Sequence, residues 1–309
     1  MKRLFTITCI FSFLLIVTGS LRAGAPIGPT IPDDSTGAAG ISPSAGGEDS
    51  LRWYTMFSNI PGDWLRYYQN TFKTENLPAI AGMAALTGAL IATDDRTWDY
   101  SHRLYHSSTL AFNLSNNIQY LGDGVPQFEL AGAFALYGFA GHNQRALRTA
   151  SQIVEAILST GGVIQVIKHV TGRQSPYVST EPRGEWAFFP NQIDYHKHVP
   201  SYDAYPSGHI ATTITTITVV MDNYPELYWY LVPVEYIAIT AIGVSMANTG
   251  IHWYSDYPLG LQLGYSFAKI ATHRTEDNTS TNSGVSGSGF SMFPSVNAQG
   301  GGLTVVLSF

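Results

Sequence analysis

The chain has 309 residues, of which 45% are hydrophobic and 12% are charged, and its formal net charge is −6 at pH 7. A nucleic-acid partner would require a basic stripe, so the acidic balance excludes that class of function. The chain contains one cysteine and therefore forms no intramolecular disulfide. Its length and apolar content suffice for one large domain around a single core.

The first residues have the pattern of a secretory signal peptide. Met1-Lys2-Arg3 precede a mostly apolar run over 4–17, and Ala23 supplies a small residue for cleavage. We therefore expect a signal peptide over 1–23 and an exported protein of the periplasm or cell envelope. Residues 24–50 are rich in Gly, Ser, Pro and Asp and lack an apolar period, which predicts a disordered linker.

Residues 51–273 have the pattern of a helical domain. Apolar periodicity broken by Gly and Pro predicts an all-α bundle with helices near 62–73, 78–93, 106–121, 126–140, 144–171, 207–222, 226–247 and 256–273. None is expected to be a clean membrane span, because polar residues such as Glu155 and Glu235 interrupt the longest apolar runs. A water-soluble bundle is favoured, with peripheral contact to a membrane left open.

The C-terminal residues change character. Residues 274–289 are polar and rich in Ser, Asn and Gly, which predicts a flexible linker. Alternation of Leu303, Val305, Leu307 and Phe309 with polar residues, after a Gly run, predicts a short β-hairpin over 290–309. A strand ending in a terminal Phe is also typical of outer-membrane barrels, but one hairpin leaves open edges and cannot span a membrane. A hairpin lying on the helical domain or pairing with another chain is favoured.

The segment Tyr205-Pro206-Ser207-Gly208-His209-Ile210 has the features of an anion-binding helix start. Proline suits the first helical turn and Ser207 can cap its unpaired N–H groups. Gly208 allows close approach to the backbone, and the helix dipole favours negative charge there. Phosphate is the expected anion, whereas an ordinary capped helix with a surface histidine is the plainer interpretation.

Two further segments favour the phosphate interpretation. In 250–256, His252 precedes Asp256 by four positions, a spacing at which the carboxylate can hold one ring nitrogen and leave the other free to attack. In 168–176, a long helical pattern ends at Gly172, and Lys168 and Arg173 bring two fixed positive charges.

The three segments resemble the signature motifs of the type 2 phosphatidic acid phosphatase superfamily, which includes bacterial acid phosphatases and vanadium haloperoxidases. The resemblance covers roughly residues 100–273 and implies the helical bundle of that superfamily. The matching positions are Lys168, Pro176, Pro206 to His209, Ser245, His252 and Asp256. Ser175 and Met246 stand where the motifs have phosphate-binding arginines, which weakens the expectation of catalysis more than that of the fold.

The resemblance implies a metal-independent phosphomonoesterase without a cofactor. His252 is expected to attack phosphorus and form a phosphohistidine, with Asp256 orienting its ring. His209 is expected to act as general acid and then as base. Lys168, Arg173 and the backbone N–H groups of Ser207 and Gly208 are expected to hold the phosphoryl oxygens.

These roles require both imidazoles to reach one phosphorus atom, so His209 and His252 are expected about 4–7 Å apart, with Lys168 and Arg173 facing the same pocket. The expected partner is a phosphorylated small molecule or a lipid head group. The aromatic stretch 174–205 between the motifs is expected to be a lid over the pocket rather than a packed surface loop.

Two alternatives remain open. A vanadium haloperoxidase would bind vanadate in the same pocket, and the absent arginines count against it. A non-catalytic phosphate-binding or envelope structural protein is consistent with Ser175 and Met246.

Overall fold

The computed structural model describes residues 54–274, 289–297 and 300–308. The expected signal peptide and linker over 1–50, and nearly all of the linker over 274–289, lie outside these residues. The first helices are α2 (Thr55–Ser58), α3 (Ile60–Thr71), α4 (Leu77–Ile91), α5 (Asp94–Tyr105) and α6 (Thr109–Ile118), with short 3-10 turns η1 (Thr74–Asn76) and η2 (Gln119–Gly122).

The second half of the domain contains the longer helices. They are α7 (Val125–Ala140), α8 (Gln144–Thr171), α10 (Gly208–Asn223), α11 (Tyr228–Thr249) and α12 (Tyr257–Thr272). Between α8 and α10 lie η3 (Pro176–Val178), α9 (Gln192–Lys197) and η4 (Val199–Ser201), and η5 (Pro225–Leu227) and η6 (Tyr254–Asp256) precede α11 and α12.

The all-α prediction is confirmed for the domain, and α5 is a helix that the sequence pattern missed. The α5 sequence is strongly polar, with Asp94 and Asp95 in the first turn and His102 and Arg103 in the last. That charge order complements the helix dipole and is the signal that could have predicted it.

Strands β1 (Gly289–Asn297) and β2 (Gly300–Ser308) pair antiparallel, with Gly289 opposite Ser308 and Asn297 opposite Gly300. The residues that join them lie outside the described part, so the hairpin as a whole stays a prediction.

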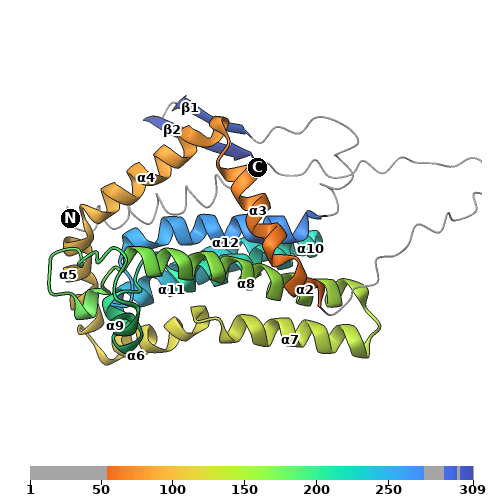
Figure 1. The fold of residues 1–309 in the computed structure, drawn as a ribbon, viewed down its shortest axis with the longest axis horizontal. Coiled ribbons are helices and arrows are strands. Elements are labelled where there is room, and N and C mark those ends of the chain that lie inside the picture. The colour runs from red at the N-terminus through yellow and green to blue at the C-terminus, as the bar shows by residue number, and fades with distance from the viewer. Residues whose placement is uncertain (1–53, 275–288, 298–299, 309) are drawn as a thin grey trace, which may run out of the picture.

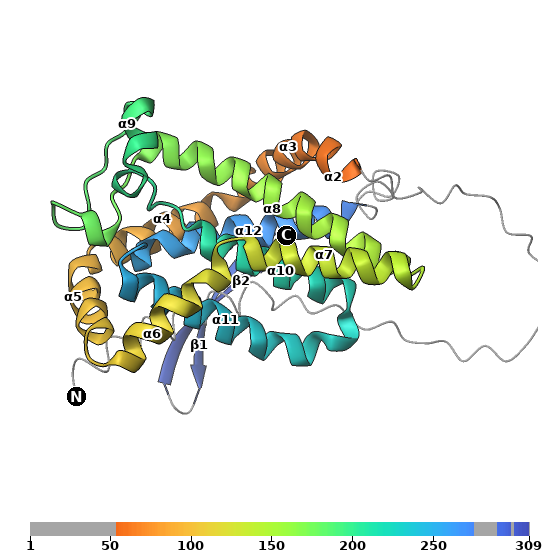
Figure 2. The same cartoon turned by 90° about the horizontal axis from the view of Figure 1, so that it is seen from below.

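Helices α8, α10 and α12 pack on one another in the middle of the bundle, with α7 against α8 and α11 against α10. Apolar side chains from these helices form the core, including Ile153, Ile214, Ile242 and Leu261. Helices α5, α6 and α9 gather at one end of the bundle in both views (Figures 1 and 2). The three sequence motifs meet at this same end.

Close contact between α10 and α12 depends on glycine. A Cβ at Gly260 would lie 2.5 Å from the Ser207 carbonyl oxygen, and one at Gly264 would lie 2.4 Å from that of Ala211. Thr215 uses this proximity to donate to the Gly264 carbonyl (3.0 Å). The two glycines therefore let the start of α10 lie directly against the first half of α12.

Two helices, Gln144–Thr171 and Pro225–Thr249, are long and apolar enough to cross a membrane, and the bent pair Thr74–Ile91 and Asp94–Tyr105 would make a third if it forms one span. The expectation that no segment qualifies is therefore wrong by length and composition. Glu155 is the only charged residue between Arg148 and Lys168, and Glu235 the only one between Glu226 and Thr249. Isolated charges of this kind are too few to disqualify either run.

Candidate active site

His209 and His252 face each other at the end of the bundle. His209 is the second residue of α10, and His252 follows Gly250, which ends α11 in a left-handed conformation (φ 77°). His209 Nδ1 lies 3.3 Å from His252 Nε2, and the ring centroids are 5.4 Å apart. The expected proximity of the two imidazoles is confirmed.

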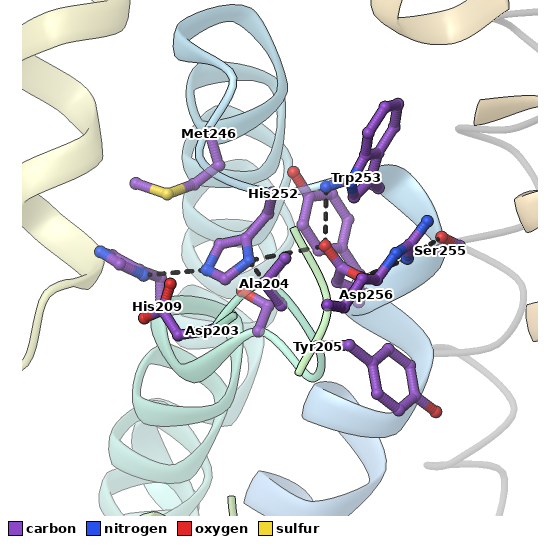
Figure 3. Close-up of polar contacts among 12 residues, drawn as sticks. Asp203, Ala204, Tyr205, His209, Met246, His252, Trp253, Ser255 and Asp256 are labelled. Atoms are coloured by element: carbon purple, nitrogen blue, oxygen red, sulfur yellow. Dashed lines mark hydrogen bonds and ion pairs between the residues drawn. The ribbon is translucent and has the colours of Figure 1, made fainter. Parts of the chain in front are cut away.

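The tautomer of His252 follows from its backbone partner. Its Nδ1 lies 2.7 Å from the carbonyl oxygen of Ala204, which can only accept, so Nδ1 carries the proton (Figure 3). Burial, followed by the positive charge of Lys168, lowers the pKa of His252 to about 3. The ring is therefore neutral, and Nε2 presents a lone pair toward His209.

Burial also lowers the pKa of His209 to about 3, with further contributions from the charges of His252 and Lys168. Because Nε2 of the neutral His252 can only accept, His209 Nδ1 must donate in this contact. The pair forms a directed chain of hydrogen bonds from His209 through His252 to Ala204.

Asp256 lies behind His252 and is completely buried. Its Oδ2 accepts from the Trp253 N–H (2.7 Å) and is 3.6 Å from His252 Nδ1. Burial raises the pKa of Asp256 to about 6, although Arg173 opposes the shift. Because the Nδ1 proton already bonds to Ala204, Asp256 supplies charge behind the ring more than it fixes the tautomer.

Arg173 does not face the histidines, which corrects the expectation that it binds a phosphoryl group. Its buried guanidinium donates to Asp256 Oδ1 (2.5 Å), Asp94 Oδ2 (2.7 Å) and Ser255 Oγ (2.7 Å). The hydroxyl of Ser255 in turn donates to Asp94 (2.5 Å). These contacts engage both terminal nitrogens of the guanidinium with two buried carboxylates, so its charge is already neutralised and is not available to substrate.

The Arg173 group is further enclosed by aromatic rings. Its guanidinium carbon lies 4.7 Å from the centroid of Trp186 and 5.3 Å from that of Trp253. Asp94, from α5, completes the group and was not predicted as a functional residue. We call Arg173, Asp94, Asp256 and Ser255 the Arg173 cluster.

Lys168 lies in the last turn of α8, with its ammonium 3.3 Å from Asp203 Oδ2. Gly172 then turns the chain away in a left-handed conformation (φ 50°), where a Cβ would lie 2.2 Å from the Ala187 carbonyl oxygen. The charge of Lys168 contributes to the low pKa of both histidines. The charge of Lys168 thus acts on the histidine pair, and its ammonium contacts Asp203.

The start of α10 differs partly from the expectation that the N–H groups of Ser207 and Gly208 bind a phosphoryl group. Ser207 caps α10, its Oγ accepting from the Ile210 N–H (3.4 Å), but its own N–H donates to the Asp256 carbonyl oxygen (2.9 Å). The Ser207 N–H is thus unavailable to a phosphoryl group. The first hydrogen bond of α10 runs from the Ala211 N–H to the Ser207 carbonyl oxygen. The N–H groups of Gly208 and His209 come before it in the chain and therefore have no acceptor within the helix.

Met246 and Ser175 occupy the two positions at which the family motifs have arginines. Met246 is fully buried in the cluster that contains Ile210, Ile242 and Tyr257. Ser175 is buried, and its N–H donates to the Pro200 carbonyl oxygen (2.9 Å). Both are packed positions, and neither presents a charge to the histidines.

The stretch 174–205 combines packed and exposed aromatic residues. Tyr195 is buried and stacks on His169 with centroids 4.1 Å apart, whereas Phe188 and Phe189 are exposed. Within the described residues, no group of three or more His, Cys, Asp or Glu side chains could hold a metal ion.

Comparison with known proteins agrees with the motifs. No curated protein matches the chain. A crystal structure described as the first transmembrane PAP2 type phosphatidylglycerolphosphate phosphatase from Bacillus subtilis aligns with 14% identity and a TM-score of 0.43, covering 72% of this chain and 97% of that one. The family model of the PAP2 superfamily matches residues 149–280. The family resemblance inferred from the motifs is thus confirmed over residues 149–280, which are similar to the PAP2 superfamily.

Proposed function

We propose that this protein is a metal-independent phosphomonoesterase that acts through a phosphohistidine on His252. The observation that supports the proposal most directly is the neutral His252 ring, held by Ala204 O at Nδ1, with its Nε2 lone pair directed at His209. A nucleophile and an acid-base group within hydrogen-bond reach are the arrangement that phosphoryl transfer through a covalent intermediate requires.

In the proposed reaction, the negative charge of the bound phosphoryl group lets His209 take up a second proton. This imidazolium protonates the leaving alcohol oxygen while His252 Nε2 attacks phosphorus. His209 then takes a proton from the water that releases phosphate. As His252 becomes positively charged, Asp256 stabilises it from behind. Lys168 and the N–H groups of Gly208 and His209 bind the phosphoryl oxygens. Arg173 acts indirectly, by holding Asp256.

The reaction requires the two rings to separate. Phosphorus must approach Nε2 to about 3–3.5 Å before attack, and the leaving oxygen lies beyond it. The 3.3 Å between His209 Nδ1 and His252 Nε2 leaves no room for that group. His209 lies at the first turn of a helix and can move by side-chain rotation, whereas His252 is held by Ala204 and its neighbours.

The apolar surface supports a substrate from a membrane. Helix α11 exposes Trp229 (81%) and Tyr230 (75%), and α7 exposes Leu136 (73%) and Phe139 (71%). Together with the two helices long enough to span a bilayer, these faces fit contact with lipid. We therefore propose a membrane-associated protein of the cell envelope that acts on a lipid phosphate, with a soluble phosphomonoester as the alternative substrate.

Turnover of 4-nitrophenyl phosphate and of phosphatidic acid in detergent micelles, both with chelator present, tests the proposal. His252→Ala should lower the rate roughly a thousandfold or more, because the nucleophile is lost. His106→Ala, at an exposed histidine of the same end, is the matched control. A phosphoenzyme trapped in the parent and absent from His252→Ala would identify the intermediate; equal turnover in the two proteins would refute the mechanism.

The non-catalytic phosphate-binding alternative is favoured by one observation, the engagement of Arg173 with two carboxylates. It predicts that the parent binds phosphate but hydrolyses neither substrate.

A further inference from the structure

The ammonium of Lys168 is paired with a carboxylate of its own chain. Asp203 Oδ2 lies 3.3 Å from Lys168 Nζ, and the side chains are 29% and 8% exposed, respectively. Lys168 is the residue that the proposed function assigns to the phosphoryl group. Any phosphoryl group that binds there meets a carboxylate already in place.

The backbone fixes Asp203 beside the histidine pair. It forms a parallel bridge with Arg173, and the N–H of Ala204 donates to the Arg173 carbonyl oxygen (3.0 Å). The Ala204 carbonyl accepts from His252 Nδ1. Asp203 is therefore adjacent in the chain to the residue that orients His252, and it lies beside the two rings (Figure 3).

We propose that Asp203 is a charge-selecting residue: it competes with the phosphoryl group for Lys168, so that the site favours phosphoryl groups with one negative charge over dianions. The inference rests on the proposed role of Lys168 as phosphoryl ligand. It adds a preference that neither the motifs nor the proposed mechanism contains.

Charge at the site supports this selection. Lys168 and Asp203 together are neutral, Arg173 is engaged by Asp94 and Asp256, and Met246 carries no charge. Repulsion from Asp203 grows with the charge of the ligand, so a dianion loses more affinity than a monoanion. Phosphomonoesters carry one negative charge below a pH of about 6 and two above it, so this selection favours the monoanionic form of the proposed substrate.

Binding of two small probes to Asp203→Asn tests the proposal without requiring turnover. At pH ~8, the Kd of inorganic phosphate, a dianion there, should fall about ten- to a hundredfold, because the lysine becomes free for a charge-assisted bond. The Kd of dimethyl phosphate, a monoanion, should fall less. In the double variant that combines Asp203→Asn with Lys168→Met, the gain in phosphate affinity should disappear.

Asp222→Asn is the matched control, since Asp222 pairs with Lys269 (2.8 Å) at the opposite end of the bundle and should leave both Kd values unchanged. Asp203→Ser provides the same charge change if Asp203→Asn does not fold. An unchanged Kd for phosphate in a folded Asp203 variant, equal gains for both probes, or the absence of phosphate binding in parent and variant alike would overturn the inference.

The outcome for Asp203 is separable from that for catalysis. An inert parent whose Asp203→Asn variant binds phosphate more tightly would refute the phosphatase and support charge selection. An active parent whose phosphate affinity does not respond to Asp203→Asn would support the phosphatase and refute charge selection.

Discussion

Two arginines in this molecule each bind two buried carboxylates, and they do so at opposite ends of the bundle. Arg173 joins Asp94 and Asp256 beside the histidine pair. Arg274, just after α12, joins Asp63 of α3 and Glu155 of α8, and we call these three residues the Arg274 cluster. Each ties together segments that are distant in the sequence.

The clusters differ in what surrounds them. The side chain of Arg173 has no exposed surface, and one of its carboxylates lies behind His252, whereas the side chain of Arg274 is 24% exposed. In the Arg274 cluster, Ser159 and Asn59 supply further hydrogen bonds to Asp63 (3.0 Å) and Glu155 (2.9 Å). The same kind of ionic group therefore lies behind the proposed nucleophile at one end and joins packed helices at the other.

The two clusters should differ most in how stability and turnover respond to replacement of their arginines. Arg173→Met leaves two carboxylates buried without a counterion, which should lower the free energy of unfolding by about 3–5 kcal/mol and abolish turnover. Arg274→Met should cost about 1–3 kcal/mol, because Arg274 is partly exposed and Ser159 and Asn59 still donate to its carboxylates, and should leave kcat/KM nearly unchanged. Thermal denaturation, with turnover measured below each melting temperature, checks both. A folded Arg274→Met without activity would contradict the distinction.

Acid should destabilise the histidine end. The folded pKa of His209 and of His252 is about 3, whereas an unfolded histidine has a pKa near 6.5. Between these values the unfolded chain binds more protons, so this stability is complete above pH ~6.5 and is lost as pH falls. At pH ~5 the loss should be about 2 kcal/mol for each histidine.

Asp256, with its pKa raised to about 6, acts in the opposite sense and offsets part of that loss as pH falls through 6. Melting temperatures at pH 7 and 5 should therefore diverge less in a His209→Gln, His252→Gln double variant than in the parent. An identical pH response in the two proteins would show that other groups dominate.

The smallest effect is expected from neutralising one carboxylate in each cluster. Asp94→Asn keeps an acceptor for Arg173 but weakens its hold on Asp256, so kcat should fall roughly tenfold with KM little changed. Asp63→Asn in the Arg274 cluster should leave kcat unaffected. Steady-state kinetics on both variants decides this; a rise in KM alone in Asp94→Asn would assign Asp94 to substrate binding.

The sequence predicted the helices that bury an apolar face and the residues whose roles depend on short spacings, such as His252 and Asp256. It could not predict where Arg173 points, since a long side chain at a helix end can reach either the pocket or the carboxylates behind it. Asp94 was missed because α5 is a polar helix that lies far from the motifs in the chain. Its role exists only through contacts with residues 79 and 161 positions away, Arg173 and Ser255.

Helix α8 contains both Glu155 of the Arg274 cluster and Lys168 of the candidate site, thirteen positions apart. An α-helix advances about 1.5 Å and turns about 100° per residue, so this one element fixes the distance between the two ends and their relative rotation. Insertion or deletion of a single residue between them would point Lys168 away from His252 while Glu155 kept its partners. The number of residues in α8 between Glu155 and Lys168 is thus a constraint on the site, which should tolerate substitutions within the helix far better than a change of its length.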